Sequence, residues 1–171
     1  MNKNLALTLT AATLFIVIGI MAAWWFNGGN IDSVKPYVDP YNNYTEAELT
    51  AMQNKGDIEA TAELGWRSFN KGDFEKAYAL YKKAADKNNA KGLTGLGLYY
   101  AHIGKYEECF KYFEAAAQQD YTVGIFNLGV AYANGDGCNQ DSQKAFTLLK
   151  KAAEKGYSPA QRVVGVYYLD G

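Results

Sequence analysis

The sequence predicts an all-α fold, namely an α-solenoid of antiparallel helix pairs preceded by one N-terminal transmembrane helix. Leu-Gly pairs at 64–65, 96–97 and 128–129 recur every 32 residues, and Val164-Gly165 follows after 36. Residues 5–26 form an uncharged apolar run, and only 3 of the 171 residues are proline. A fixed period of this length is typical of stacked helical repeats, and the scarcity of proline favours closely packed helices.

The composition allows one domain with an appendage and excludes several classes of function. Apolar residues make up 49% of the chain, which is enough for a packed core. Lys and Arg number 17 against 18 Asp and Glu. This balance argues against a nucleic-acid partner, because nucleic-acid-binding proteins carry a basic face. With 1 His and 2 Cys and no spaced ligand cluster, a zinc site is excluded, and we expect no cofactor.

Residues 1–26 read as a transmembrane signal anchor. At about 1.5 Å per residue, the run of residues 5–26 is long enough to cross a bilayer core. A cleaved signal peptide is the alternative, although its apolar region is typically shorter. Lys3 precedes the run and no positive charge follows it within residues 27–32. The positive-inside rule therefore predicts a single-pass protein of the cytoplasmic (inner) membrane with its repeat domain on the periplasmic side.

A polar linker is expected over residues 27–44, because Gly28-Gly29, Pro36 and Pro40 interrupt any helix. Its tyrosines are expected at the membrane surface or on the solenoid. The solenoid itself is expected over residues 45–171. Its first helix is expected to begin at Thr45, where Glu48 would complete a capping box.

Each repeat unit is predicted to contain two antiparallel helices of about three turns. The second helices share a register at residues 81–85, 113–117 and 149–153, and the third unit has four extra residues in its interhelix loop at 134–141. The glycine of each Leu-Gly pair would let the second helix approach closely, while Tyr81 and Phe113 fill the space between units. The predicted units span about 58–89, 90–121 and 122–157, with a partial unit at 158–171.

These patterns resemble the tetratricopeptide repeat and the related Sel-one-like repeat. Residues 58–121 are more similar to tetratricopeptide units. The string at 126–137, with its Gly135-x-Gly137 loop, and the Lys151-Ala152-Ala153-Glu154-Lys155-Gly156 ending resemble Sel-one-like units. The resemblance implies a solenoid that binds protein partners. Alanine stands at 85, 117 and 153, where cysteine-rich secreted members carry disulfides, so that subfamily and its penicillin-binding role are not supported.

The chain ends at Gly171, after the first helix of a fourth unit, so that helix is predicted to lack a cover. Solenoids normally end in a polar capping helix. Either the native chain continues, or this face meets a partner or a second copy in a homodimer.

No residue cluster predicts catalysis, so we expect no enzyme. His102 has no acidic or nucleophilic neighbour at helical spacing and is interpreted as a helix-terminal residue. Cys109 and Cys138 fall at the same end of the stacked hairpins, where a disulfide would stabilise the fold by about 3 kcal/mol. The alternative is two separate thiols, with Cys109 replacing the alanine found at 77 and 145 in the other units.

The first helices are expected to line the concave face, because that is their place in the resembling repeats. This face has an apolar, aromatic centre with polar edges, a composition that suits a bound helix or extended peptide. The predicted partner-binding residues are Trp66, Phe69, Lys91, Leu98, His102, Phe126, Val130 and Asn134. The alternative is that Trp66, Phe69 and Phe126 belong to the core between units and the groove is inert.

We therefore expect a membrane-anchored scaffold or adaptor whose concave face binds a protein or peptide. The alternative is a periplasmic immunity protein that inhibits a secreted toxic effector. A single tight partner would favour the alternative, and several weaker partners would favour the scaffold.

Overall fold

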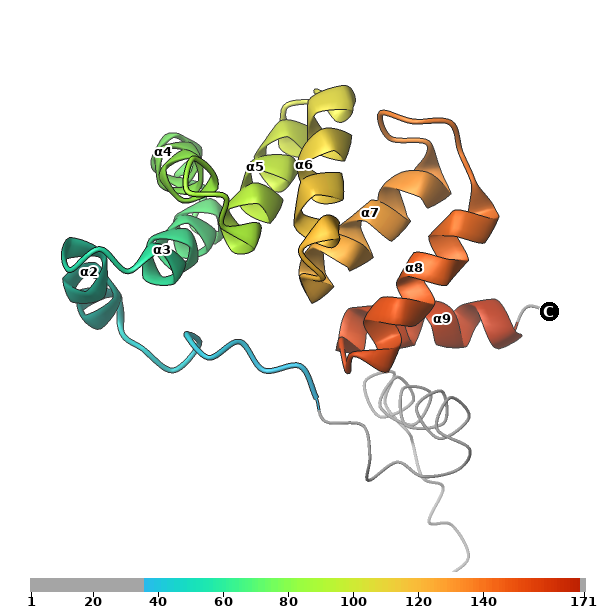
Figure 1. The fold of residues 1–171 in the computed structure, drawn as a ribbon, viewed down its shortest axis with the longest axis horizontal. Helices are drawn as coiled ribbons and strands as arrows, with labels where there is room; N and C mark the ends of the chain where they lie inside the picture. Colours follow the sequence, from blue (N-terminus) through green and yellow to red (C-terminus); the bar gives the residue numbers. More distant parts are fainter. Residues whose placement is uncertain (1–35, 170–171) are drawn as a thin grey trace, which may run out of the picture.

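A computed structural model describes residues 36–169, in which the helices follow one another from left to right as a curved double row (Figure 1). No strand occurs in this described part. The helices are α2 (Glu46–Asn54), α3 (Ile58–Asn70), α4 (Phe74–Ala85), α5 (Ala90–His102), α6 (Tyr106–Gln118), α7 (Thr122–Asn134), α8 (Ser142–Glu154) and α9 (Ser158–Leu169). The predicted all-α solenoid is confirmed for these residues.

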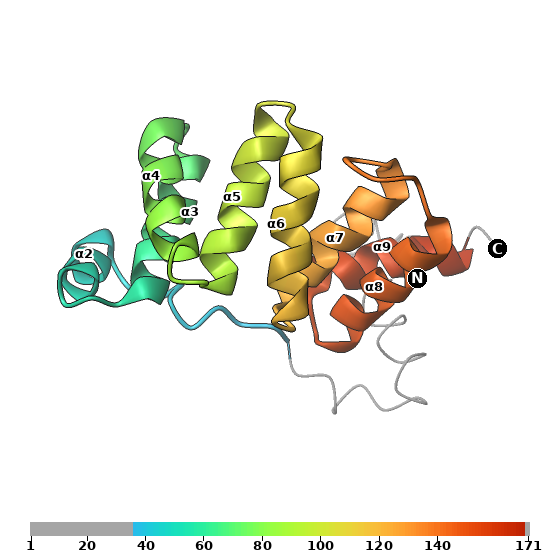
Figure 2. The ribbon, with the colours of Figure 1, turned by 45° about the horizontal axis from the view of Figure 1, so that its top comes forward.

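Consecutive helices pack as hairpins, and the hairpins stack. The first helices of the three units are also in contact with one another, α3 with α5 and α5 with α7. They therefore form a continuous inner row, with α4, α6 and α8 outside it (Figures 1 and 2). This arrangement places the first helices along the concave side of the solenoid, as the sequence predicts.

Helix starts follow the local capping residues. Thr45 accepts a hydrogen bond from the Glu48 backbone N–H, and the Glu48 carboxylate accepts one from the Thr45 N–H. This capping box confirms the predicted start of α2. Asp57, Asp73 and Asp141 accept hydrogen bonds from backbone N–H groups in the first turns of α3, α4 and α8. Because a helix start leaves its first N–H groups without partners, each acidic cap defines where a helix begins.

Glycines bring the two helices of a unit together. A Cβ on Gly65 would lie 2.8 Å from the Tyr81 ring, and one on Gly97 would lie 2.4 Å from the Phe113 ring. Tyr81 is 1% exposed and also packs on Gly95 of the next unit. The prediction that these aromatic residues fill the space between units is confirmed, because Tyr81 packs on Gly95 and Phe113 packs with Leu128 of α7.

The four extra residues of the third unit lie in the loop before α8, and they leave the helices intact. A Cβ on Gly137 would lie 2.1 Å from the carbonyl oxygen of Tyr106. The loop therefore rests directly on the start of α6 in the preceding unit, and Gly137 permits that contact.

Helix α9 forms the exposed end of the described solenoid. Val164 is fully buried against α8, whereas Val166, Tyr167 and Tyr168 are exposed. Phe146 packs edge-on against both tyrosine rings. A homodimer through this helix stays a prediction.

The predicted transmembrane segment, residues 5–26, lies outside the described residues. Among residues 36–169, no helix has the length and apolar character needed to cross a bilayer.

Candidate binding groove

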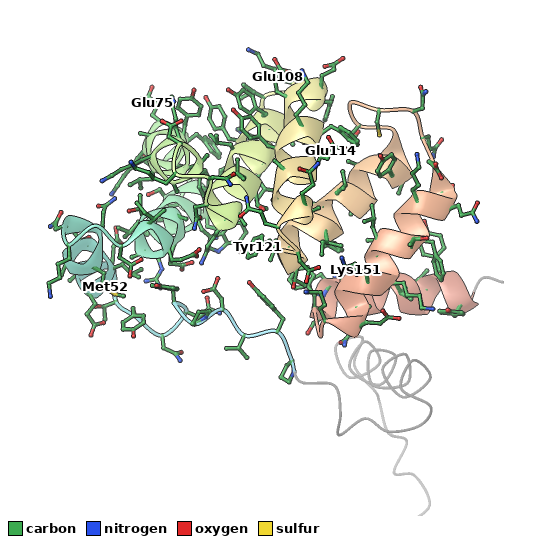
Figure 3. All side chains as sticks on the ribbon, viewed as in Figure 1. Met52, Glu75, Glu108, Glu114, Tyr121 and Lys151 are labelled. Carbon is green, nitrogen blue, oxygen red and sulfur yellow. The ribbon has the colours of Figure 1, made fainter. Side chains whose placement is uncertain are left out.

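Residues 36–44, here named the strap, lie along the inner row of helices. The strap runs from the turn before α2, beside α3 and α5, towards the junction of α8 and α9 (Figures 1 and 2). Tyr121, at the start of α7, lies on the strap side of the molecule, whereas Glu75 and Glu108 lie at the far edge (Figure 3). The linker predicted over residues 27–44 thus packs on the solenoid in its described part.

Alternate side chains of the strap face the helices. Pro36, Val38, Pro40 and Asn42 are exposed, while Tyr37, Asp39 and Tyr41 between them are partly buried. Residues 36–39 are extended, whereas Asp39 and Tyr41 accept turn hydrogen bonds from the backbone N–H groups of Asn42 and Tyr44. The inward side chains are therefore a carboxylate with one aromatic ring on each side of it in the sequence.

Tyr37 fixes the strap to the third unit. Its backbone N–H donates to the Gly156 carbonyl oxygen at 3.1 Å, and its ring meets Tyr157 edge-on with centroids 5.7 Å apart. Its hydroxyl also hydrogen-bonds with that of Tyr121, and burial raises the pKa of both phenols. Both hydroxyls therefore stay protonated at neutral pH.

Asp39 contributes to a group of four charges, in which Lys91 and Glu63 are buried and Asp39 and Arg67 are partly buried. The Lys91 ammonium lies 2.5 Å from the Asp39 carboxylate and 2.5 Å from that of Glu63. Glu63 also pairs with Arg67 at 2.9 Å, so two carboxylates face two cations. Buried charges are tolerated only when paired in this way. Burial lowers the pKa of Lys91, but hydrogen bonds with Asp39 and Glu63 and the charges of these groups outweigh it, so the pKa lies above its usual value.

Tyr41 fixes the strap to the first unit. Its hydroxyl donates to Asp57 at 3.2 Å, and its carbonyl oxygen accepts from Arg67 at 3.1 Å. The Lys91 ammonium lies 5.7 Å from the centre of the Tyr41 ring, within the range of a cation–π contact. Lys91 therefore contacts a side chain of the strap, and Arg67 contacts one of its backbone carbonyl groups.

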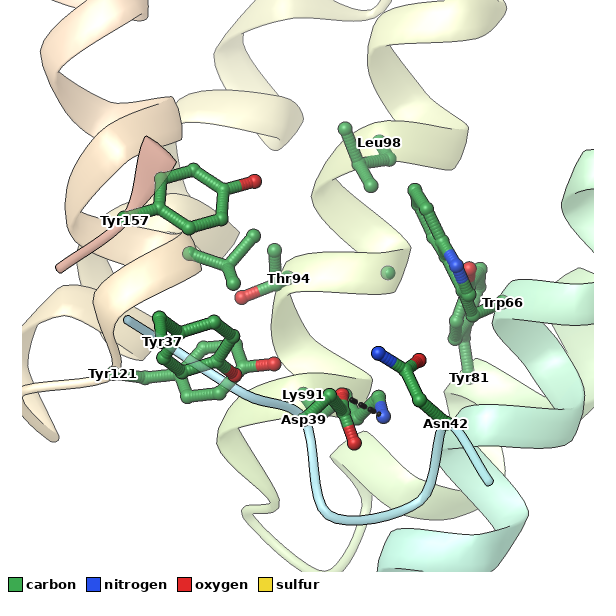
Figure 4. Close-up of a pocket in the computed structure, with 12 residues that line it drawn as sticks. Tyr37, Asp39, Asn42, Trp66, Tyr81, Lys91, Thr94, Leu98, Tyr121 and Tyr157 are labelled. Atoms are coloured by element: carbon green, nitrogen blue, oxygen red, sulfur yellow. Dashed lines mark hydrogen bonds and ion pairs between the residues drawn. The ribbon is translucent and has the colours of Figure 1, made fainter. Parts of the chain in front are cut away.

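Beside the strap, the concave face keeps an unfilled cavity of about 160 Å³. Figure 4 shows Trp66 and Leu98 on one side of it and Tyr157 on the other, with the ion pair between Asp39 and Lys91 at its base. The complete lining is Tyr37, Asp39, Asn42, Trp66, Tyr81, Lys91, Thr94, Gly95, Leu98, Tyr121, Val123 and Tyr157. The strap and this cavity together are the candidate groove.

Three of the predicted partner-binding residues meet in this groove. Trp66 is 41% exposed and Leu98 is partly buried, and both line the cavity. Lys91 also lines it but is buried, because the strap covers it and Asp39 pairs with it. In this structure Lys91 pairs with a residue of the same chain, so its predicted contact with a partner stays a prediction that requires displacement of Asp39.

The other predicted residues lie elsewhere. The His102 ring stacks on Phe74 with centroids 4.0 Å apart, and Phe69 packs edge-on against both rings. These three rings form a separate aromatic cluster where α3, α4 and α5 meet. His102 is the last residue of α5, as expected.

Phe126, Val130 and Asn134 follow one another along α7 away from the strap. Phe126 packs on Tyr157, with ring centroids 5.1 Å apart, and Val130 packs on the core between α7, α8 and α9. Asn134 is exposed and donates to Asp136 in the following loop. The structure thus gives Phe126 and Val130 packing roles and does not bring them to the cavity.

Cys109 and Cys138 are both free thiols here, so the disulfide considered from sequence is not formed. The Cys109 side chain is 2% exposed and packs with Phe113, Leu128 and Ala131. The Cys138 sulfur instead lies 3.7 Å from the Ala131 carbonyl oxygen. Cys109 thus occupies the place of the fully buried alanines at 77 and 145, the alternative that the sequence left open.

Sequence reasoning missed Tyr37, Asp39 and Glu63 as groove residues. The available signals were weak: a Tyr-x-Asp-x-Tyr pattern at 37–41, and an acidic residue at 63 where the next unit has Gly95. Neither signal predicts which residue each of these contacts, because the contacts join residues that are far apart in the chain.

Residues 58–89, 90–121 and 122–157, more than half of the chain, match the Sel1 repeat. The chain belongs to the Sel1 repeat family. Proteins with Sel1 repeats are generally scaffolds for protein–protein interaction, and the match indicates no catalytic family. No curated protein sequence matches this Sel1 repeat chain.

Two solved structures support the Sel1 repeat fold. A Sel1 repeat protein from Oxalobacter formigenes is 28% identical with a TM-score of 0.54, over 69% of this chain and 95% of that one. A protective antigen of uropathogenic Escherichia coli strains that displays an SLR fold is 23% identical with a TM-score of 0.62. That likeness concerns the fold alone, and it covers 91% of this chain but only 34% of the antigen.

Proposed function

We propose that this Sel1 repeat protein is an adaptor of the bacterial envelope whose concave groove binds an extended segment of a protein partner. The strap supports this proposal, because the groove already holds a peptide segment that is extended at residues 36–39 and turns at residues 40–44. It is bound through aromatic rings, a buried ion pair and backbone hydrogen bonds at once. A groove with these contacts suits recognition of an extended peptide.

Trp66 is the residue best placed to meet such a partner. Its indole borders the cavity and is 41% exposed, and tryptophans in such positions often dominate binding energy. The cavity of about 160 Å³ is similar in size to the cavity of about 150 Å³ that accepts a benzene molecule in an engineered protein. It therefore has room for one aromatic ring of a partner.

The membrane location is part of the proposal. Residues 5–26 supply an uncharged run long enough to cross a bilayer, and Lys3 on its N-terminal side favours a cytoplasmic N-terminus. The strap follows this run closely in the chain. The groove would thus work near the periplasmic surface of the inner membrane.

Site-specific photo-crosslinking in cells tests the groove. A photoreactive residue at Trp66 or Leu98 is expected to capture the same partner, whereas one at the exposed Lys83 on α4 is expected to miss it. Trp66→Ala should then weaken the binding of the purified partner by about 2 kcal/mol. Equal capture from all three positions, together with an unchanged affinity, would refute a concave binding site.

The location is tested separately by fractionation. The full chain is expected to remain in the membrane pellet after alkaline extraction and to be cleaved by protease added to spheroplasts. Recovery in the soluble fraction, or protection until the cells are lysed, would exclude the proposed anchor or its orientation.

A further inference from the structure

The strap has the contacts of a bound ligand, although it belongs to the same chain. Its three inward side chains each meet a distinct set of partners: Tyr37 the third unit, Asp39 the buried cations, and Tyr41 the first unit. The intervening Val38 is 64% exposed and contributes little. A separate peptide with the same spacing would find the same partners.

The charges of the groove select an acidic ligand. Without Asp39, the Lys91 ammonium would retain Glu63, but Glu63 already pairs with Arg67. Two cations would then share the Glu63 carboxylate in a largely buried place, and this group would lack one negative charge. A carboxylate at the position of Asp39 restores the balance.

The strap fills the groove incompletely, and this gives a partner an advantage. The cavity bordered by Trp66 and Leu98 remains open beside the strap. The Tyr81 hydroxyl in its lining is buried and has no hydrogen-bond partner in the described residues. A segment that fills this cavity would bury apolar surface that the strap leaves exposed, and so would bind better than the strap.

We propose that the strap occupies the site of the partner, and that the partner presents a segment with the backbone course of the strap, with one aromatic side chain two residues before a carboxylate and another two residues after it. This inference rests on the proposed function and specifies the chemistry of the same groove. Binding in trans replaces Tyr37, Asp39 and Tyr41 by their equivalents and releases the strap. The strap thereby sets a threshold that weak or unrelated peptides do not pass.

The threshold can be sized. A segment tethered by a short linker has an effective concentration of about 1 mM. If the free strap sequence binds the groove with a Kd of about 0.1 mM, the tethered strap is bound about ten times more often than it is open. The apparent affinity of a competing peptide is reduced by that same factor of about ten.

The test uses the full chain in detergent and a fluorescent nonapeptide with the sequence of residues 36–44. Fluorescence anisotropy compares the wild type with a Tyr37→Ser, Asp39→Ser double variant, whose strap has lost two anchors while the helices that bind the strap are unchanged. The peptide is expected to bind the double variant about tenfold more tightly. A peptide with Asn at the position of Asp39, and the double variant with Lys91→Met added, are the matched controls, and both should lose most of the binding.

Hydrogen exchange of the wild type gives a second measurement that needs no variant. Added peptide should accelerate exchange of the Tyr37 amide, which is bonded to Gly156 when the strap is bound. Equal peptide affinity for wild type and double variant, or binding that ignores Lys91→Met, would overturn the inference. Sedimentation that shows wild-type dimers dissociated by the double variant would also overturn it, because the occupant would then be the strap of a second copy.

These outcomes are distinct from failure of the proposed function. Crosslinking at Trp66 and Leu98 does not depend on the peptide. A captured partner without peptide binding would leave the adaptor standing and remove the strap exchange. Peptide binding without any captured partner would do the reverse.

Discussion

Substitution of Gly95 by alanine should destabilise the solenoid more than the same change at Gly129. A Cβ on Gly95 would lie 2.1 Å from two carbons of the Tyr81 ring, whereas ordinary carbon contacts are about 3.5–4.0 Å. Gly65 also packs closely on this ring, since a Cβ there would lie 2.8 Å from it. At Gly129 the nearest atom would be a Leu149 side-chain carbon at 3.0 Å.

The expected magnitudes follow from two opposing effects. Alanine improves helix propensity by about 1 kcal/mol over glycine. Overpacking typically costs about 1–3 kcal/mol and sometimes more, and the overlap at Gly95 is severe. We therefore expect Gly95→Ala to lower the free energy of unfolding by about 2 kcal/mol, and Gly129→Ala to leave it within about 1 kcal/mol of the wild type.

Urea denaturation of the full chain, followed by far-UV circular dichroism, measures both variants. Adding Tyr81→Leu to Gly95→Ala should recover part of the loss relative to the sum of the single changes, by about 1 kcal/mol or more, because the two residues are in contact. Equal stability of the two glycine variants, or strict additivity with Tyr81→Leu, would refute the packing argument.

Three further predictions concern thiols, pH and helix caps. A thiol reagent at pH 8 should modify Cys138 in the native, unreduced protein and reach Cys109 only on unfolding; if neither reacts until a reductant is added, the two are joined. Burial raises the pKa of Cys109 to about 12 from its ordinary 9.0, so the thiol loses its proton at a lower pH in the unfolded chain than in the folded one. The free energy of unfolding should therefore fall as pH rises above about 9, by at most about 1.4 kcal/mol per pH unit. Cys109→Ala should make the stability measured by denaturation depend less on pH in this range. Asp57→Ala and Asp141→Ala should each lower the free energy of unfolding by about 1 kcal/mol, because each removes a helix cap. Only Asp57→Ala should also speed hydrogen exchange in the strap, because Asp57 accepts the hydrogen bond of the Tyr41 hydroxyl. Equal exchange in both variants would contradict that contact.

The helices could be predicted because their signals are local or periodic. Thr45 and Glu48 form the capping box three residues apart, and Gly65 and Gly97 occupy equivalent sites where a second helix must approach. These features depend on positions within one unit or on the repeat itself. A sequence pattern can therefore carry them without knowledge of the rest of the molecule.

The groove could be predicted only in part, because its charges pair over long distances. Lys91 was correctly placed on the inner row, but Asp39 lies 52 residues before it and no period relates the two. The burial of Lys91 depends on a segment outside the repeats. Phe126 shows that a place on an inner helix is not sufficient. It lies on α7 as expected, but its ring packs on Tyr157 and does not line the cavity.

The strap also has a consequence for the mechanics of the solenoid. Repeat units normally contact only their neighbours, so curvature can vary along such a chain like that of a spring. Here one short segment is bonded both to Gly156 in the third unit and to Arg67 in the first. It thus links the first and third units directly across the concave side. Exchange of the strap for a ligand would remove or replace this link between the first and third units. A change in the curvature of the solenoid would then reach the outer surface formed by α4, α6 and α8.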